Sequence, residues 1–589
     1  MRATATNPRI ISDVKRARWL LESSPALAAV HQRFQHTRAF QRAAQILDVT
    51  GRYGLKHDRV SLPVNQRARA SHFAKFIAQP AGNRYTPILS DVDCVRLGCC
   101  LHLLELLHTY TACSLPRHTM VPCLGMPISQ SRTIAFDVLR RVETQNAYAD
   151  EALRAELGPG VRTEDAGLAT ELTLGVLRWW RLLDFLIDRN LTKATKTLDT
   201  EVRIALRLGV YQLWFLERVP AHAAVHESVE LVKRARKRSA APLVNAVLRK
   251  AAKEAAQFAR SRSAFASFLP ADLPIVEQMG ILHSHPTWLV ERWLRNVGEE
   301  RTRALLETNN HVPDVSCYVL DAQRRDDVVS SLKKVGCVIE PGLLLRDAWR
   351  LRAGNPGATE AMQKGWAAIQ DEASQTVAHL LAVEEGNSVL DLCAAPGGKT
   401  ILLARAAGSE GHVIAADLHG HRVRAMAERF ETAGVRNVEL VTLDGTQPLP
   451  FKNRFDRILV DAPCSGTGTL ARHPEIRWQL RAEDLTDLHA RQVRLLKNAL
   501  ANLAPHGRLI YSTCSLEPEE NEHVVSEALG GARGEFRVVT PRRALQQLLR
   551  DGVAVESLID ADGFFRTCSS AHGTDGFFAA AIEPTSKNF

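Results

Sequence analysis

The sequence lacks a long uninterrupted apolar run. Its longest candidate, Leu97 to Leu107, is interrupted by Glu105. It is also shorter than the roughly 18 to 20 residues that a membrane-spanning helix needs. We therefore expect no membrane partner.

Paired cysteine spacings are missing as well. Five of the 11 cysteines fall before residue 126, and the other six are spread over the rest without the spacing of a disulfide framework or a zinc site. The histidines give one i, i+4 pair, His222 and His226, with no cysteine nearby. These absences predict a cytoplasmic protein in a reducing compartment, without a bound metal.

Acidic residues are scarce at the N-terminus. Residues 1–90 hold 15 Lys or Arg against 4 Asp or Glu, so the net charge of +10 leaves about −1 for everything after them. The positive net charge therefore comes from the N-terminal residues, and it does not by itself indicate that the rest of the chain binds nucleic acid. We expect residues 1–125 to be a poorly ordered extension, most simply upstream sequence from too early a start codon. A targeting peptide or a basic arm are the alternatives.

Residues 126–255 are almost wholly helical in pattern. Apolar residues recur at helical spacing in Ser131–Arg141, Leu168–Ile187 and Val202–Phe215, which predicts an all-α domain. Residues 256–370 mix a predicted helix, Pro286–Asn309, with two short β-like pieces, Val315–Leu320 and Gly336–Glu340. They predict a small α+β connector.

A basic run interrupts the otherwise balanced helical part. It comprises Lys233, Arg234, Arg236, Lys237 and Arg238. Such a run is more often a solvated helix face than a binding patch, but concentrated positive charge also suits RNA phosphates. Both interpretations stay open.

After Ser388, short apolar strands alternate with helices, which is typical of a doubly wound α/β sheet. This predicts a catalytic domain over residues 371–589. The expected strands are Val389–Leu392, Val413–Ala416, Val438–Leu443, Arg457–Val460, Arg508–Tyr511, Phe536–Val539 and Phe577–Ile582.

A turn of small residues joins the first of these strands to a helix. It comprises Cys393, Ala394, Ala395, Pro396, Gly397, Gly398 and Lys399. Such a turn lets the backbone approach a ligand closely, although glycine turns also serve plain helix packing. Asp417 and Asp444 end the next two strands, where acids can accept ribose hydroxyls. Since neither G-x-G-x-x-G nor a P-loop is present, an adenosine-type ligand such as S-adenosylmethionine fits best.

Two cysteines follow the next two strands, Cys464 in DAPCSGTG and Cys514 in YSTCS. A free cysteine is most often a small buried hydrophobe. These two, however, stand at strand ends, where ligands of α/β sheets bind, and are flanked by Ser, Thr or Gly. We therefore expect both to be reactive.

Methylation of cytosine at C5 explains why two thiols and an acid would be wanted. C5 is a poor nucleophile until a thiolate adds at C6, and an acid at N3 favours that addition. A second group must then help to remove the C5 proton and release the base. Asp461, three residues before Cys464, suits the N3 role. The residues alone do not say which thiol attacks.

The sequence closely resembles the RNA (cytosine-5) methyltransferases, specifically the bacterial Sun/RsmB type that methylates small-subunit ribosomal RNA. The matching stretches are Cys393–Lys399, Asp461–Gly468, Tyr511–Glu522 and His572–Ala580, with Val219–Lys233 and Val244–Arg249 resembling a NusB-like domain.

The resemblance implies an all-α NusB-like RNA-binding domain, the connector, and a Rossmann-like class I methyltransferase domain. It implies Cys514 as nucleophile, Cys464 for elimination, and a methyl-donor site formed by the turn with Asp417, Asp444 and Asp461. It also implies 16S ribosomal RNA as substrate, and we expect a monomer. Residues 1–125 have no counterpart in the family, and Glu307–Pro313 lacks the basic residue that the family often has there.

Other functions stay possible from sequence alone. A transfer RNA methyltransferase shares the fold, and the NusB-like stretches favour ribosomal RNA over it only by analogy. A protein substrate has no C6 for a thiolate to attack. A NusB-like RNA-binding protein with an inactive C-terminal domain would not need both cysteines and the acids.

Overall fold

The computed structural model describes residues 128–158, 160–191, 194–531 and 534–585. The extension expected over residues 1–125 lies outside these residues. Within the described ranges, no helix is both long enough and apolar enough to cross a membrane.

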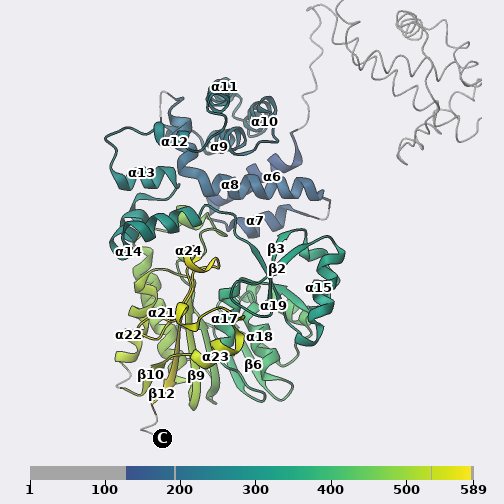
Figure 1. Cartoon of the computed structure of the whole chain (residues 1–589), viewed down its shortest axis with the longest axis vertical. Helices are drawn as coiled ribbons and strands as arrows, with labels where there is room; N and C mark the ends of the chain where they lie inside the picture. The colour runs from purple at the N-terminus through teal and green to yellow at the C-terminus, as the bar shows by residue number, and fades with distance from the viewer. Residues whose placement is uncertain (1–127, 159, 192–193, 532–533, 586–589) are drawn as a thin grey trace, which may run out of the picture. The chain divides into compact units, whose positions relative to one another are not determined.

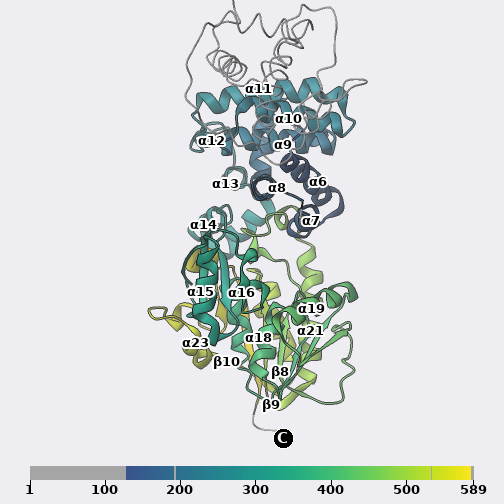
Figure 2. The same ribbon diagram turned by 90° about the vertical axis from the view of Figure 1, so that its right-hand side faces the viewer.

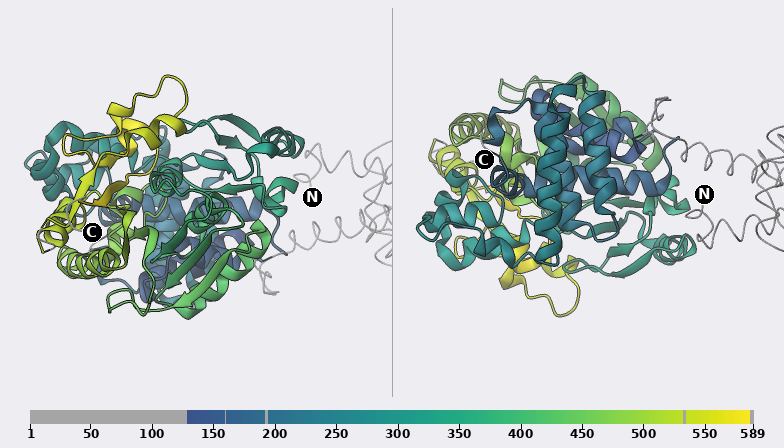
Figure 3. Two further views of the ribbon diagram at one scale, coloured as in Figure 1. Left: turned by 90° about the horizontal axis from the view of Figure 1, so that it is seen from below. Right: turned by 90° about the horizontal axis from the view of Figure 1, so that it is seen from above.

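The first part is a helical bundle (Figure 1). Its helices are α6 (Gln130–Gln145), α7 (Ala149–Glu156), α8 (Thr163–Asp188), α9 (Thr200–Phe215), α10 (Ala221–Arg234) and α11 (Ala241–Gln257). Helix α9 is apolar on nearly every side and is buried along most of its length, as expected of a central helix. Its neighbours α8, α10 and α11 pack around it, and their long axes are visible from above in Figure 3. The predicted all-α part is confirmed.

The connector combines helices with a small antiparallel sheet of order β2-β3-β1-β4. Its elements are α12 (Ala264–Ser267), α13 (Ile275–Leu282), α14 (Thr287–Thr308), β1 (Val315–Val319), α15 (Arg325–Lys334), β2 (Val338–Pro341), β3 (Ala348–Ala353), α16 (Glu360–Gln363) and β4 (Ala367–Ile369). The predicted strands appear as β1 and β2. The predicted helix Pro286–Asn309 is interrupted at Gly298, whose φ is +78°.

The C-terminal part is built on a mixed sheet of order β10-β12-β9-β8-β5-β6-β7, with β11 pairing β12. Its elements are α17 (Glu372–Leu380), β5 (Ser388–Asp391), α18 (Gly398–Ala407), β6 (His412–Asp417), α19 (Gly420–Ala433), β7 (Val438–Thr442), β8 (Phe455–Asp461), α20 (Ile476–Gln479), α21 (Asp484–Ala501), β9 (Leu503–Thr513), α22 (Glu522–Gly530), β10 (Phe536–Val539), α23 (Arg542–Leu548), β11 (Phe565–Arg566), α24 (Ser569–His572) and β12 (Phe578–Pro584). Strands β5 to β9 are parallel, whereas β12 and β10 run antiparallel to their neighbours. Every strand predicted in this part is present.

Helices cover both faces of this sheet, since successive strand residues point to opposite sides. On one face, Val389, Leu459 and Ile510 pack against α17, α18 and α23. On the other, Leu390, Ile458 and Leu509 pack against α21 and α22. The predicted α/β methyltransferase-like fold is confirmed, and both cysteines follow central strands.

The segment Ala471–Gln479, which follows Cys464 closely, is bound to the helical bundle. The guanidinium of Arg178 in α8 donates to the carbonyl of Ala471 over 2.9 Å, and the Trp478 indole N–H donates to the carbonyl of Leu177 over 2.7 Å. The helical part thus contacts the chain ten residues beyond Asp461, the last residue of β8.

Arg477 is the most buried connection in this segment, with 1% of its surface exposed. Burial lowers its pKa well below the ordinary arginine value. Its guanidinium donates to Arg178 O (3.1 Å), Ser284 O (3.1 Å), Asn310 Oδ1 (2.8 Å), Asn309 O (2.6 Å) and Leu470 O (3.3 Å). One side chain therefore joins the bundle, the connector and the catalytic part.

Replacing Arg477 with Ala should lower the free energy of unfolding by about 3 kcal/mol, because several buried carbonyls lose their donor. Urea denaturation followed by tryptophan fluorescence measures the change. The control is Arg481→Ala, since Arg481 is exposed and its truncation should change stability by less than about 0.5 kcal/mol. Equal stabilities of the two variants would contradict this role.

Candidate active site

Cys464 and Cys514 lie side by side beyond the carboxyl ends of β8 and β9. These strands pair in parallel with Asp461 opposite Ser512, so the two loops begin at the same level. The sulfur atoms are 3.3 Å apart, and both side chains are half-buried. A single pyrimidine ring could contact both sulfurs at this spacing.

The surroundings of Cys464 disfavour its thiolate form. The hydrogen bond with Cys514 and then burial raise the pKa of Cys464 well above its ordinary value, and the charge of Glu520 adds to this. Cys464 is therefore a protonated thiol at neutral pH.

An ion pair lies beside the two thiols. Lys399 Nζ is 2.7 Å from Asp461 Oδ2, and Ser512 Oγ donates to Asp461 Oδ1 over 2.8 Å. Burial would lower the pKa of Lys399, but the charges of Asp461 and then of Cys514 outweigh burial and raise it. The Lys399 ammonium thus supplies a fixed positive charge next to the thiols, and it also lies 5.2 Å from the centre of the Phe577 ring.

The glycine turn after β5 leads into α18 and is tied to the next strand, since Ala394 N–H donates to Ala416 O over 2.9 Å. Gly397 has a φ of +94°, and a Cβ there would lie 2.8 Å from the Phe430 ring. A residue with a side chain is therefore disfavoured at position 397 by both the backbone conformation and the packing. The glycine turn leaves the N-terminus of α18 accessible to a ligand.

The two acids expected in the cofactor site lie at the ends of the two strands that follow β5 on one side of the sheet. Asp417 is the last residue of β6, and Asp444 lies two residues beyond β7. Asp417 is 8% exposed, and its carboxylate accepts the amide N–H of His419 over 2.9 Å. Asp444 is exposed, and hydrogen bonds from the hydroxyl and amide of Thr446 lower its pKa. The structure thus brings the turn and both acids to one edge of the sheet.

Asp391, the last residue of β5, was not singled out from the sequence. It is 1% exposed, and Thr400 Oγ1 donates to its Oδ2 over 2.7 Å, while its Oδ1 has no hydrogen-bond partner among the described residues. Burial raises the pKa of Asp391 to about 7. A buried acid with a free oxygen beside the turn is a polar group that a ligand could satisfy.

The stretch His572–Ala580 closes against the Cys464 loop. A Cβ on Gly468 would lie 2.1 Å from Gly576 O, and Gly576 N–H donates to Gly468 O over 2.8 Å. Arg472, also missed from sequence, donates to Asp371 and Asp575 over 2.8 Å each. The four stretches singled out in this domain therefore meet at one site.

The basic run lies at the end of α10, away from the strands in both Figures 1 and 2. Lys233 pairs with Glu230, Arg234 with Asp137 and Lys237 with Asp199, at 2.7, 2.7 and 2.9 Å. Arg236 and Arg238 are exposed. Part of the positive charge of the run is therefore offset by neighbouring carboxylates.

Among the described residues, Asp150, His473 and Glu475 bring potential metal-ligand atoms within 4.8 Å of one another. His222 and His226 lie apart from them on α10. Glu475 Oε1 already accepts the amide N–H of Ala149 over 3.1 Å. The buried carboxylate therefore joins the start of α7 to the segment that follows Cys464.

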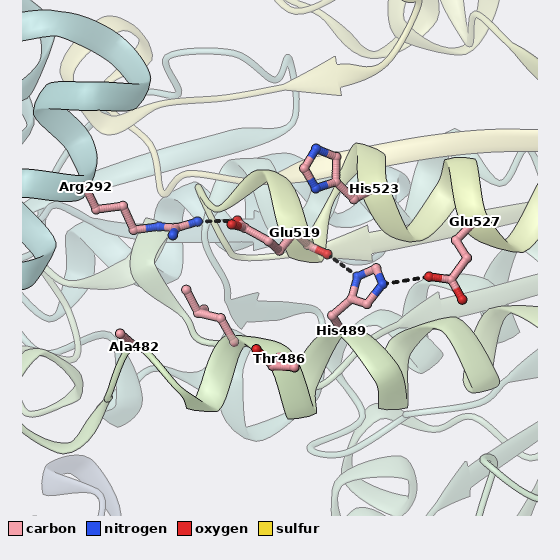
Figure 4. Close-up of a pocket in the computed structure, with 8 residues that line it drawn as sticks. Arg292, Ala482, Thr486, His489, Glu519, His523 and Glu527 are labelled. Carbon is pink, nitrogen blue, oxygen red and sulfur yellow. Dashed lines mark hydrogen bonds and ion pairs between the residues drawn. The ribbon is translucent and has the colours of Figure 1, made fainter.

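A separate polar pocket lies between α14, α21 and α22 (Figure 4). Its His489 ring nitrogens lie 2.6 Å from Glu519 O and 2.9 Å from Glu527 Oε2, and Arg292 pairs with Glu519. These polar groups satisfy one another, and neither cysteine lines the pocket.

The pH dependence of stability should report the burial of Asp391. The native carboxyl keeps its proton up to about pH 7, whereas the unfolded one, with a pKa of 3.8, loses it. The native state therefore binds more protons between these values, and stability falls as pH rises through this window, by at most about 1.4 kcal/mol per pH unit. Asp391→Asn should remove this dependence of the free energy of unfolding on pH.

Urea denaturation of the natural protein and of Asp391→Asn between about pH 5 and pH 8 measures the difference. Parallel curves of unfolding free energy against pH would contradict the assignment. Asp575, whose pKa burial also raises to about 7, is present in both proteins and cancels.

Comparison with known proteins gives two family matches. Residues 378–583 match the family described as 16S rRNA methyltransferase RsmB/F, and residues 129–253 match the NusB family. A probable ribosomal RNA small subunit methyltransferase B of Bacillus subtilis is 31% identical over 455 residues, covering 77% of this chain and 98% of the relative. Ribosomal RNA small subunit methyltransferase B of Pseudomonas putida is 34% identical, covering 74% of this chain and 97% of the relative.

The crystal structure of PH0851 has the same fold, with a TM-score of 0.63 at 23% sequence identity, and covers 78% of this chain and 99% of its own. The two family matches and the relatives confirm the resemblance inferred from the sequence motifs, for the helical part and for the C-terminal part alike. The chain belongs to the ribosomal RNA small subunit methyltransferase B family.

Proposed function

We propose that the protein transfers a methyl group from S-adenosylmethionine to C5 of a specific cytosine in 16S ribosomal RNA. The observation that carries the chemistry is the pair of thiols, 3.3 Å apart, beside the Lys399–Asp461 ion pair. The printed names of the relatives support the substrate. With this substrate the enzyme acts in the cytoplasm, and we expect a monomer.

The edge of the sheet fits the cofactor. The turn Cys393–Lys399 would lie against it, Asp417 would accept the ribose hydroxyls, and Asp444 and Asp461 would border it, while the free Oδ1 of Asp391 offers a further polar contact. When bound, S-adenosylmethionine supplies the methyl group as a sulfonium electrophile. The carboxylates of Asp417, Asp444 and Asp461 suit its positive charge.

The first step in our proposal is attack by the Cys514 thiolate on C6 of cytosine. The bond from sulfur to C6 forms, the C5–C6 double bond opens to leave an enamine-like C5, and the proton that the Cys514 thiol gave up passes through Asp461 to N3. Asp461 accepts the hydrogen bond from this proton. The Lys399 ammonium, 2.7 Å from Asp461, keeps that carboxylate ionised and offsets negative charge on the ring.

Release of the product falls to Cys464. After C5 gains the methyl group, the C5 proton must leave and the bond from Cys514 to C6 must break. A sulfur 3.3 Å from Cys514 is placed to take part at the neighbouring carbon. For this step Cys464 must first give its own proton to solvent. Its thiolate then accepts the C5 proton, which restores the thiol form favoured by its surroundings, while the N3 proton returns to the departing Cys514 sulfur.

RNA recruitment is assigned to the helical part. The match to the NusB family over residues 129–253 supports an RNA-binding role there. In the basic run, Arg236 and Arg238 are exposed and form no ion pair among the described residues, so they could contact phosphates directly. Lys233, Arg234 and Lys237 would exchange their carboxylate partners for phosphates.

The substrate is tested by incubating the protein with methyl-labelled S-adenosylmethionine and either 16S ribosomal RNA or transfer RNA. Label in 16S RNA at one cytosine, mapped by bisulfite sequencing, is the expected result. Label in transfer RNA instead would favour the alternative substrate, and no transfer to either would remove the proposal.

Cys514→Ala should reduce methyl transfer by a factor of at least about 10⁴, because the covalent route is lost, while binding of S-adenosylmethionine stays within about twofold. Methyl transfer is measured by capturing the RNA on filters and counting the methyl label, and cofactor binding is measured by calorimetry. Cys568→Ala is the matched control, since Cys568 is a half-buried free cysteine outside the thiol pair. Full activity of the Cys514 variant would overturn the nucleophile assignment.

Cys464→Ala should trap the covalent protein–RNA adduct, because attack and methylation proceed but elimination does not. The adduct is expected as a slowly migrating band on a denaturing gel after mixing with RNA and S-adenosylmethionine. The double variant lacking both cysteines should give no band. An adduct formed by Cys514→Ala in place of Cys464→Ala would reverse the two roles.

A further inference from the structure

One fully buried carboxylate, Glu520, lies beneath both cysteine loops. Its side chain has no exposed surface. Glu520 Oε1 accepts the backbone N–H of Ser465 over 2.8 Å and Gln492 Nε2 over 2.9 Å. Glu520 Oε2 accepts the hydroxyl of Ser515 over 2.5 Å and that of Ser465.

The positions of these donors are significant because Ser465 and Ser515 directly follow the two cysteines. The same carboxylate therefore binds the residue after Cys464 and the residue after Cys514. The two serine hydroxyls also lie 3.0 Å apart. No other described side chain is shown to bond to both loops in this way.

Glu520 is itself hydrogen-bonded to β9 through its backbone carbonyl. Tyr511 OH donates to the carbonyl of Glu520 over 2.6 Å, and the side chain of the next residue, Asn521, donates to Ser515 O over 2.9 Å. Glu520 thus cannot move without disturbing the strand that leads to Cys514.

The donors to the Glu520 side chain are all neutral groups: the Ser465 amide and hydroxyl, the Ser515 hydroxyl and the Gln492 side-chain amide. Over the described ranges, no Lys, Arg or His side chain forms an ion pair with it. A buried carboxylate held only by hydrogen bonds depends on keeping all of them, since each lost bond leaves a desolvated polar atom. This favours one arrangement of the two loops over any other.

We propose that Glu520 is a positioning residue that sets the spacing of the Cys464 and Cys514 sulfurs by bonding to Ser465 and Ser515. The importance of this spacing for methyl transfer rests on the proposed function of the two thiols. The spacing itself is a property of the protein without RNA.

The experiment measures thiol spacing directly with phenylarsine oxide, whose arsenic bonds to two thiols with loss of its oxygen as water and bridges them only when they are adjacent. Mass spectrometry of the intact protein counts the arsenic bound, and iodoacetamide then labels the thiols left free. In the natural protein we expect protection of Cys464 and Cys514 together. The variants Cys464→Ala and Cys514→Ala lack a pair and define the background.

Glu520→Ala should reduce the apparent affinity for bridging at least about tenfold and methyl transfer on the order of 100-fold, as expected for reacting groups misplaced by about 1 Å. Glu520→Gln keeps the side-chain volume and one acceptor oxygen. Its NH₂ group, however, cannot accept the two serine hydroxyls that donate to Oε2 in the natural protein. Its effect should lie between those of the natural protein and the Ala variant. The KM for S-adenosylmethionine should stay within about twofold in both, since Glu520 does not contact the turn.

The matched control is Glu372→Ala. Glu372 is equally buried in the same domain, and its carboxylate accepts three backbone N–H groups, of Leu343, Leu344 and Leu345, away from the cysteines. It should lose stability and keep bridging. Bridging at natural affinity in folded Glu520→Gln would overturn the proposal, as would an equal loss in Glu372→Ala. Where Glu520→Ala does not fold, the Gln variant decides. Because bridging requires no RNA, failure of methyl transfer to 16S RNA would remove the proposed function and leave this result readable.

Discussion

The parallel pairing of β8 with β9 fixes where the reactive groups stand. Asp461 lies opposite Ser512, so Cys464 and Cys514 emerge at nearly the same height above the sheet. A shift of the pairing by one residue would displace one loop by about 3.3 Å along the strand and reverse the faces of its side chains. It would separate the sulfurs and also break the contact of Ser512 with Asp461. The thiol pair, the ion pair and the buried carboxylate all depend on this register.

The helical bundle takes part in the architecture of the catalytic centre. Arg477 and Trp478 bind its backbone, and they lie shortly after Cys464 in the chain. The loop that carries one thiol is therefore held at one end by a β-strand and at the other by a different domain. Such an arrangement links the position of the helical bundle to the geometry at the cysteines through directly hydrogen-bonded residues.

The sequence pattern predicted the main architecture and many of the residues at the site. Strand ends could be located because apolar runs such as Val389–Leu392 stop at polar or small residues, and the cysteines followed two of them. The small sheet was found only in part: β3 (AWRLRA) carries two arginines, which make ion pairs with Asp314 and Glu340 instead of giving an apolar pattern, and β4 has only three residues.

Residues whose importance comes from tertiary contacts were the ones missed. Glu520 sits in a matching stretch, but nothing in the order of residues shows that its carboxylate reaches a serine in another loop. Arg477 appears in sequence as one charged residue among many, and its burial depends on three parts of the chain meeting around it. Asp391 reads as the polar end of a strand, yet its lack of a partner for one oxygen appears only after folding. The assignments of Cys514, Cys464 and Asp461 to separate chemical roles, and of the basic run to RNA, stay predictions.

The short distance between the two sulfurs also has a stereochemical meaning. Neighbouring atoms 3.3 Å apart leave no room for a ring between them, so a cytosine can meet both only with one and the same face. In the proposed mechanism, addition at C6 and removal of hydrogen at C5 then take place on that face. The methyl group must reach C5 from the opposite face, which pushes the C5 hydrogen toward the sulfurs as the carbon becomes tetrahedral. In that mechanism the base would lie between the thiols on one face and the methyl donor on the other.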